Sequence, residues 1–128
     1  MKALFVGLGS IGQRHLRNLI TLVPKIELMA VRSTRSAPTL SNENQVIDNI
    51  SIKDQYKIIE FESLNLALSH KPDMVFVTNP TSMHIKVAQE ALKSGAYIFM
   101  EKPISHNNEG VKELLKLEDS FCREKICI

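Results

Sequence analysis

Three glycines near the N-terminus have a spacing suited to binding a diphosphate. Gly7, Gly9 and Gly12 form a G-x-G-x-x-G pattern between a short apolar run and a segment with helical periodicity. In such a turn the first glycine permits a tight bend, the second lets a pyrophosphate approach the backbone, and the third lets the helix pack closely on the strand. Free N–H groups at the start of the helix, near Ser10 and Ile11, would then hold the phosphates. The pattern favours a dinucleotide site over its alternative, a turn that binds nothing.

The residues after the second apolar run bear on which dinucleotide would bind. In many NAD sites an acidic residue about 20 positions beyond the glycine loop binds the ribose 2′-hydroxyl. Here the sequence reads VRSTRS, with Arg32, Ser33 and Arg35 and no carboxylate within reach. An arginine fork and hydroxyl donors suit a 2′-phosphate. The sequence therefore predicts a preference for NADP(H), with NAD(H) as the second cofactor, unless one or both arginines are only solvated loop residues.

The segment TNPTSMH follows another apolar run and should line the same crevice. Asn79, Pro80 and Thr81 are expected to form a loop near the ribose of the cofactor, because ligands of doubly wound sheets lie beyond the carboxyl ends of the strands. His84 falls in the first turn of the next predicted helix. Its ring either faces the crevice or lies on the helix surface, and the sequence leaves both open.

The segment EKP stands at the end of a further predicted strand. Glu101 and Lys102 lie at the strand end, and Pro103 fixes the chain beyond them. A lysine held near a nicotinamide ring can bind a substrate hydroxyl or carbonyl oxygen and carry a proton. The alternative is an exposed lysine in a turn, and the segment alone does not exclude it.

These residues lie where predicted strands and helices meet. Strands are expected at residues 2–7, 25–32, 56–61, 72–79, 96–102 and 125–128, and helices at 10–23, 62–71, 81–95 and 108–124. Residues 33–55 are polar and weakly periodic, which indicates a loop with one short helix. The strands are continuous apolar runs, as in a parallel sheet covered on both faces. The predicted fold class is α/β, a doubly wound parallel sheet (Rossmann) of about six strands with helices on both faces.

Composition excludes several other classes of protein. The 128 residues suit one domain, and a formal net charge of +2 with no basic stripe argues against a nucleic-acid partner. No apolar run reaches the roughly 18 residues of a membrane span, and no signal-peptide pattern is present, so the expected location is cytoplasmic. No metal site is expected. Cys122 and Cys127 are expected to be buried thiols in a reducing compartment.

The combination of GLGSIGQRH, TNPTSMH and EKP resembles the glucose–fructose oxidoreductase, inositol dehydrogenase and rhizopine-catabolism (Gfo/Idh/MocA) family. The resemblance extends over the whole chain and implies an N-terminal Rossmann domain that binds NAD(P). It also implies that Lys102 lies beside the nicotinamide and is catalytic, that Glu101 and Pro103 shape its loop, and that residues 79–81 with His84 contact the cofactor. The implied reaction is reversible hydride transfer at a hydroxyl-bearing carbon of a sugar, cyclitol or related small molecule.

Members of that family are longer and carry a second domain. The second domain forms the substrate site and often the dimer interface, so residues 1–128 are expected to be the dinucleotide-binding domain without its C-terminal substrate and dimerisation domain. Such a fragment should turn over little or no substrate, and the full-length protein should be a homo-oligomer. The alternative function is a non-catalytic nucleotide-sensing module of the same fold. An S-adenosylmethionine site is a third reading, which the arginine at position 32 disfavours.

Overall fold

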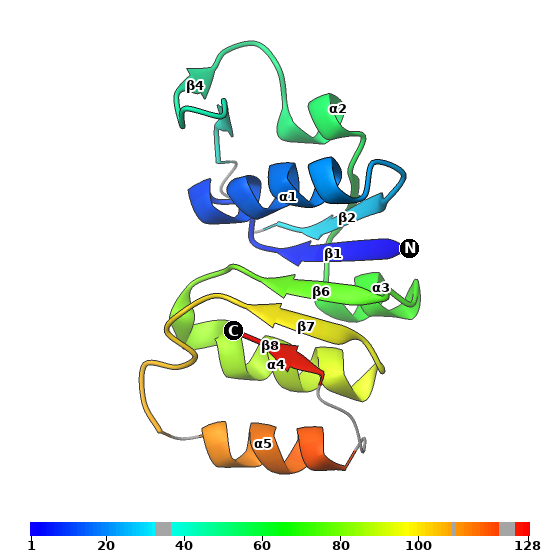
Figure 1. The fold of residues 1–128 in the computed structure, drawn as a ribbon, viewed down its shortest axis with the longest axis vertical. Helices are drawn as coiled ribbons and strands as arrows, with labels where there is room; N and C mark the ends of the chain where they lie inside the picture. The colour runs from blue at the N-terminus through cyan, green and yellow to red at the C-terminus, as the bar shows by residue number, and fades with distance from the viewer. Residues whose placement is uncertain (33–36, 109, 121–124) are drawn as a thin grey trace.

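A six-stranded parallel sheet runs through the computed structural model, which describes residues 1–32, 37–108, 110–120 and 125–128. The strand order is β5-β2-β1-β6-β7-β8, and every neighbouring pair is parallel (Figure 1). The strands are β1 (Lys2–Val6), β2 (Glu27–Val31), β5 (Ile59–Phe61), β6 (Met74–Val77), β7 (Tyr97–Met100) and β8 (Ile126–Cys127). The predicted doubly wound topology is confirmed.

Helices cover both faces of the sheet. They are α1 (Ser10–Leu22), α2 (Ile52–Tyr56), α3 (Leu64–Ser69), α4 (His84–Lys93) and α5 (Val111–Asp119), with a short 3-10 turn, η1 (Thr81–Met83), before α4. Within the described ranges no helix has both the length and the apolar character needed to cross a membrane.

The central strand β1 explains why the strands read as continuous apolar runs. Successive side chains of a strand point to opposite faces. Phe5 packs with Leu16 of α1 and Ile52 of α2 on one face. Leu4 and Val6 pack on the other face, in a cluster drawn from α3, α4 and α5 that includes Ala67, Val87, Ala91, Leu92 and Leu114. Because both faces of the strand are buried, neither face needs polar residues.

The segment before β5 is more ordered than the sequence indicates. The described part of the expected loop holds a two-stranded antiparallel sheet, β3 (Thr39–Leu40) and β4 (Val46–Ile47), as well as the expected short helix α2. The Ser51 side chain caps α2 by accepting a hydrogen bond from the backbone N–H of Asp54 at 3.1 Å. Residue 56 ends this helix rather than beginning a strand, because Lys57 adopts a left-handed conformation that stops the helix.

A buried glutamine attaches this segment to α1. The side chain of Gln13 is inaccessible to solvent. Its Nε2 donates to the carbonyls of Leu8 and Pro38, at 3.1 and 2.8 Å, and its Oε1 accepts from the backbone N–H of Leu40 at 2.8 Å. Gln13 therefore links the glycine loop to the chain that follows β2.

One expectation about the cysteines is wrong. Cys127, in the last strand, is exposed, because β8 lies at the edge of the sheet and has a parallel partner on one side only. Cys122 lies outside the described residues.

Candidate functional site

The strand register gathers the predicted site residues at one edge of the sheet. Val6 of β1 pairs with Val31 of β2 and with Val77 of β6, and Val77 pairs in turn with Met100 of β7. The residues that follow these four strand ends therefore lie in one row beyond the carboxyl edge: Gly7, Arg32, Thr78 and Glu101. Ligands of doubly wound sheets bind at this edge.

The glycine loop between β1 and α1 is tightly packed at two of its glycines. Gly7 has φ +97°, and a Cβ there would lie 2.8 Å from the backbone of Asn79. A Cβ on Gly12 would lie 2.4 Å from the carbonyl oxygen of Gly7 and 2.9 Å from the hydroxyl of Thr78, which itself donates to that carbonyl at 2.6 Å. Only glycine lets α1 approach β1 and β6 this closely.

Gly9 differs from the other two glycines of the pattern. A Cβ added there would meet no atom of the described residues within 4 Å. Gly9 precedes the first turn of α1, a helix of 13 residues that begins at Ser10, and no side chain caps that turn. The N–H groups at Ser10 and Ile11 are thus donors at a helix N-terminus beside bare backbone, an arrangement suited to an anion.

Two adjoining hollows open along this edge. The larger has a volume of about 490 Å³ and the smaller about 350 Å³, and both are lined by Gly7, Arg32, Asn79 and Pro80. We call the two together the edge cleft. The larger hollow is completed by residues after β5, in η1 and on α4, namely Glu62, Ser63, Leu64, Asn65, Met83, Lys86, Val87 and Glu90 with the strand ends Val6 and Val31. The smaller is completed by Leu8, Gly9, Ala37 and Thr78.

Asn79 lines both hollows of the edge cleft, and its side-chain amide is unsatisfied. Both polar atoms of its side chain are buried, and neither has a hydrogen-bond partner among the described residues. Buried polar groups are nearly always paired, so an orphaned amide in a cleft indicates a missing polar partner. The open backbone at Gly9 and the cation at Arg32 belong to the same cleft as this amide. The residues present therefore fit a polar, anionic ligand such as a dinucleotide.

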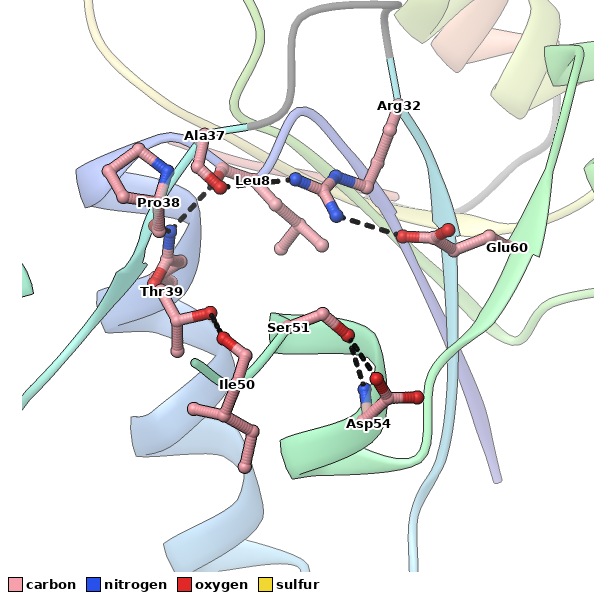
Figure 2. A network of polar contacts seen from close by, with 10 residues as sticks. Leu8, Arg32, Ala37, Pro38, Thr39, Ile50, Ser51, Asp54 and Glu60 are labelled. Atoms are coloured by element: carbon pink, nitrogen blue, oxygen red, sulfur yellow. Dashed lines mark hydrogen bonds and ion pairs between the residues drawn. The ribbon is translucent and has the colours of Figure 1, made fainter. Parts of the chain in front are cut away.

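Arg32 is held by a carboxylate that the sequence analysis did not expect (Figure 2). Its Nη1 donates to Glu60 Oε1 at 2.9 Å, and its Nη2 donates to the carbonyl of Ala37 at 3.3 Å. Glu60 belongs to β5, the neighbour of β2 in the sheet, where it pairs with Ala30. The expectation that no carboxylate lies within reach is wrong, because the sheet brings one from 28 residues along the chain. Ser33 and Arg35 lie outside the described residues.

His84 connects two of the predicted site segments. Its ring is 2% exposed, so the helix-surface alternative is wrong. Nε2 lies 2.8 Å from the carbonyl oxygen of Asn79, and Nδ1 lies 3.0 Å from that of Pro103. A carbonyl only accepts, so the ring donates to both only when both of its nitrogens carry a proton. His84 thus ties the loop after β6 to the EKP segment, although it does not line the edge cleft.

Glu101 makes a contact with α1 that sequence reasoning missed. Its Oε1 forms a short hydrogen bond with Nε2 of His15, whose ring packs on Phe99 at 4.7 Å between centroids. The His15 hydrogen bond is the main cause that lowers the pKa of Glu101. Partial burial opposes this shift, and the hydrogen bond from the backbone N–H of Lys102 reinforces it. Position 15 stands within the motif GLGSIGQRH, but nothing local to that motif indicates its partner.

The remaining predicted residues lie around the same edge without lining the cleft. Lys102 is exposed directly after Glu101, and the peptide bond to Pro103 is cis. Thr81 opens the 3-10 turn η1 that follows Pro80. Within the described ranges no group of three or more His, Cys, Asp or Glu side chains is placed to hold a metal ion.

The lowered pKa of Glu101 predicts a pH dependence of stability. A carboxylate whose pKa is depressed by folding contributes stability above its unfolded value, 4.5, and that contribution is lost as the pH falls through the lower folded value. We expect the urea midpoint of the wild type to fall with pH in this window, and E101Q to lack that part of the fall. Glu27→Gln, at an exposed position, is the matched control. Identical pH profiles for E101Q and the wild type would contradict the prediction.

Comparisons with known proteins agree with this geometry. The family model for the Gfo/Idh/MocA oxidoreductases, described as an NAD-binding Rossmann fold, matches residues 1–122. The chain belongs to this family. The resemblance noted in the sequence is therefore confirmed, as is the Rossmann-like fold.

Individual relatives are named as dehydrogenases of cyclitols. The chain is 31% identical to scyllo-inositol 2-dehydrogenase (NAD(+)) of Bacillus subtilis (strain 168) over 84% of this chain and 29% of that protein. It is 26% identical to inositol 2-dehydrogenase of Salmonella typhimurium over 92% of this chain and 33% of that protein. The chain thus spans about a third of the length of these relatives.

A solved structure shares the fold. Scyllo-inositol dehydrogenase from Lactobacillus casei, with bound NAD(H) and scyllo-inositol, superposes with a TM-score of 0.75 at 24% identity, covering 99% of this chain and 35% of that one. The likeness extends over nearly all of this chain and shows that the two proteins share this fold.

Proposed function

We propose that this chain is the cofactor-binding part of an NAD(P)-dependent oxidoreductase acting on a hydroxyl-bearing carbon of a sugar or cyclitol. The observation that carries the proposal is the edge cleft, where open backbone at Gly9, the orphaned amide of Asn79 and the guanidinium of Arg32 meet. The names of the relatives support the class of substrate, since the relatives from B. subtilis and S. typhimurium are both named for inositol oxidation.

Different residues bind different parts of the dinucleotide. The dinucleotide, when bound, supplies the hydride acceptor or donor. The N–H groups at Ser10 and Ile11 donate to its phosphates, and the amide of Asn79 pairs with a ribose hydroxyl. Pro80 and Thr81 continue the same loop along the cofactor.

Lys102 is the proposed catalytic residue. It is exposed at the carboxyl end of β7, where an ammonium can donate to a substrate oxygen and later take up or release a proton. Glu101, held by His15, positions the start of its loop. Positioning of the substrate supplies much of an enzyme's rate, and we propose that a C-terminal substrate and dimerisation domain beyond these residues supplies it.

We further propose that NADP(H) is preferred and that NAD(H) is also accepted. Replacing Arg32 with aspartate should then raise the Kd for NADPH relative to that for NADH by at least about tenfold. This is the effect expected from losing one hydrogen bond between charged groups. Calorimetry with each dinucleotide measures the ratio. Lys86→Asp, which makes the same charge change in the same cleft, should weaken both dinucleotides to a similar degree. An unchanged ratio in R32D would end the proposal of a 2′-phosphate site.

Calorimetry on this chain also tests the proposal as a whole. No heat of binding with either NADPH or NADH would refute it. Turnover is assayed with the full-length protein and a panel of inositols and sugars, by following the absorbance of the reduced dinucleotide. Binding without turnover of any member of the panel would favour the nucleotide-sensing alternative. The cytoplasmic location and the homo-oligomer stay predictions.

A further inference from the structure

Glu60 contacts Arg32 at the edge cleft, and the proposed function gives it no role. We propose that Glu60 is a specificity-determining residue, whose carboxylate competes with a 2′-phosphate for Arg32 and so limits the preference for NADP(H). The inference rests on the proposed function, because it concerns which dinucleotide the same cleft accepts.

The geometry places the carboxylate and the cleft on the same guanidinium. Arg32 lines both hollows of the edge cleft, and its two terminal nitrogens are already engaged by Glu60 and by the carbonyl of Ala37 (Figure 2). These two contacts hold the guanidinium in one orientation between β5 and the chain after β2. Each terminal nitrogen retains a second N–H, so the arginine can still receive an anion from the cleft.

An anion that uses those N–H groups must lie close to Glu60. The side chains of Arg32 and Glu60 are 17% and 31% exposed, so the guanidinium is largely shielded from bulk water and the carboxylate partly so. Charges in such a position are screened less, and a dianionic 2′-phosphate beside the carboxylate is repelled. A ribose 2′-hydroxyl carries no charge and escapes this penalty, and a carboxylate is a good acceptor for it. Glu60 therefore weakens NADPH selectively.

The variant Glu60→Gln isolates this effect, because it keeps the shape of the side chain and an oxygen that can accept from Arg32. We expect the ratio of Kd for NADH to Kd for NADPH to rise about three- to tenfold in E60Q, by relief of repulsion at a partly exposed site. The control is Glu62→Gln, which removes the same charge from a residue that lines the larger hollow. It should move the ratio by much less.

A second background shows whether the effect passes through Arg32. In R32Q the guanidinium for which carboxylate and phosphate compete is absent, so adding E60Q should change the ratio little. Circular dichroism of each variant verifies folding. If E60Q does not fold, Glu60→Asp withdraws the carboxylate by one methylene and should shift the ratio in the same direction.

Each outcome decides the matter. A ratio that stays constant in folded E60Q, or that falls because Glu60 merely holds Arg32 in place for the phosphate, overturns the inference. So does an equal rise in E62Q, or a rise that persists undiminished in the R32Q background. Failure of the wild-type chain to bind either dinucleotide refutes the proposed function instead. That result distinguishes a failure of the proposed function from a failure of the inference about Glu60.

Discussion

Replacing Gly12 with alanine is expected to lower the free energy of unfolding by about 2–3 kcal/mol, as overpacking of a close contact does. The added methyl group would lie 2.4 Å from the carbonyl oxygen of Gly7, a backbone atom that cannot rotate away. On an exposed helix face the same substitution would stabilise the protein by about 1 kcal/mol, because alanine has the higher helix propensity. The sign of the effect therefore reports the packing of α1 on β1. Urea denaturation followed by circular dichroism measures it.

Gly9→Ala is the matched control for this prediction. Its methyl group would meet no atom within 4 Å in the part of the chain that the structure describes, and the backbone at residue 9 has a φ of −67° that alanine adopts freely. We expect a loss of at most about 1 kcal/mol of stability, from the weaker helix-capping preference of alanine. Dinucleotide affinity should nevertheless fall at least about tenfold, since the methyl group fills the space proposed for a phosphate. Equal stability of G12A and G9A, or full affinity in G9A, would contradict this division of roles.

The fold could be predicted because its signals are local. The run from Lys2 to Val6 is apolar at every position after the lysine, and a strand with both faces buried requires that pattern. The ends of three strands are marked by Gly7, Asn79 and the EKP segment. These marks predict the position of the carboxyl edge of the sheet. Since parallel strands share one carboxyl edge, predicting the strands also predicted which loops would meet.

Side-chain partners across the sheet were not predictable in the same way. The residues that follow Arg32 in the chain include no nearby carboxylate, whereas its partner Glu60 comes from β5, the neighbouring strand in the sheet. His15 and Glu101 are 86 residues apart, and only the order of the strands brings them together. Gln13 looks like a polar residue on a helix surface, and its burial depends on a hairpin whose two short strands have no periodicity to detect.

The contacts of His84 link two segments that the sequence predicts separately. Neither TNPTSMH nor EKP contains a signal that it contacts the other. The histidine ring, on the first residue of α4, reaches the carbonyl oxygens of Asn79 and Pro103 at once. The loop that carries the orphaned amide of Asn79 is thereby fixed relative to the loop that carries Lys102. His84 thus contacts both loops although it is not among the residues that line the edge cleft.

Replacing His84 with alanine should therefore lower the free energy of unfolding by about 2–4 kcal/mol, because it opens a cavity at a buried site and removes a hydrogen-bond donor from a backbone carbonyl. His106→Ala, at an exposed position, should change stability by less than about 0.5 kcal/mol. Urea midpoints measure both changes.

A readout besides stability separates positioning from simple loss of packing. His84→Gln keeps a side-chain N–H donor that can reach one of the two carbonyls, so it should recover part of the stability while leaving the two loops unlinked. At a temperature where all variants are folded, we expect H84A and H84Q to bind the dinucleotide more weakly than the wild type does. Wild-type affinity in both folded variants would show that His84 only fills space. Affinity restored fully by glutamine would show that one carbonyl contact is enough, and that the second does not hold the loops together.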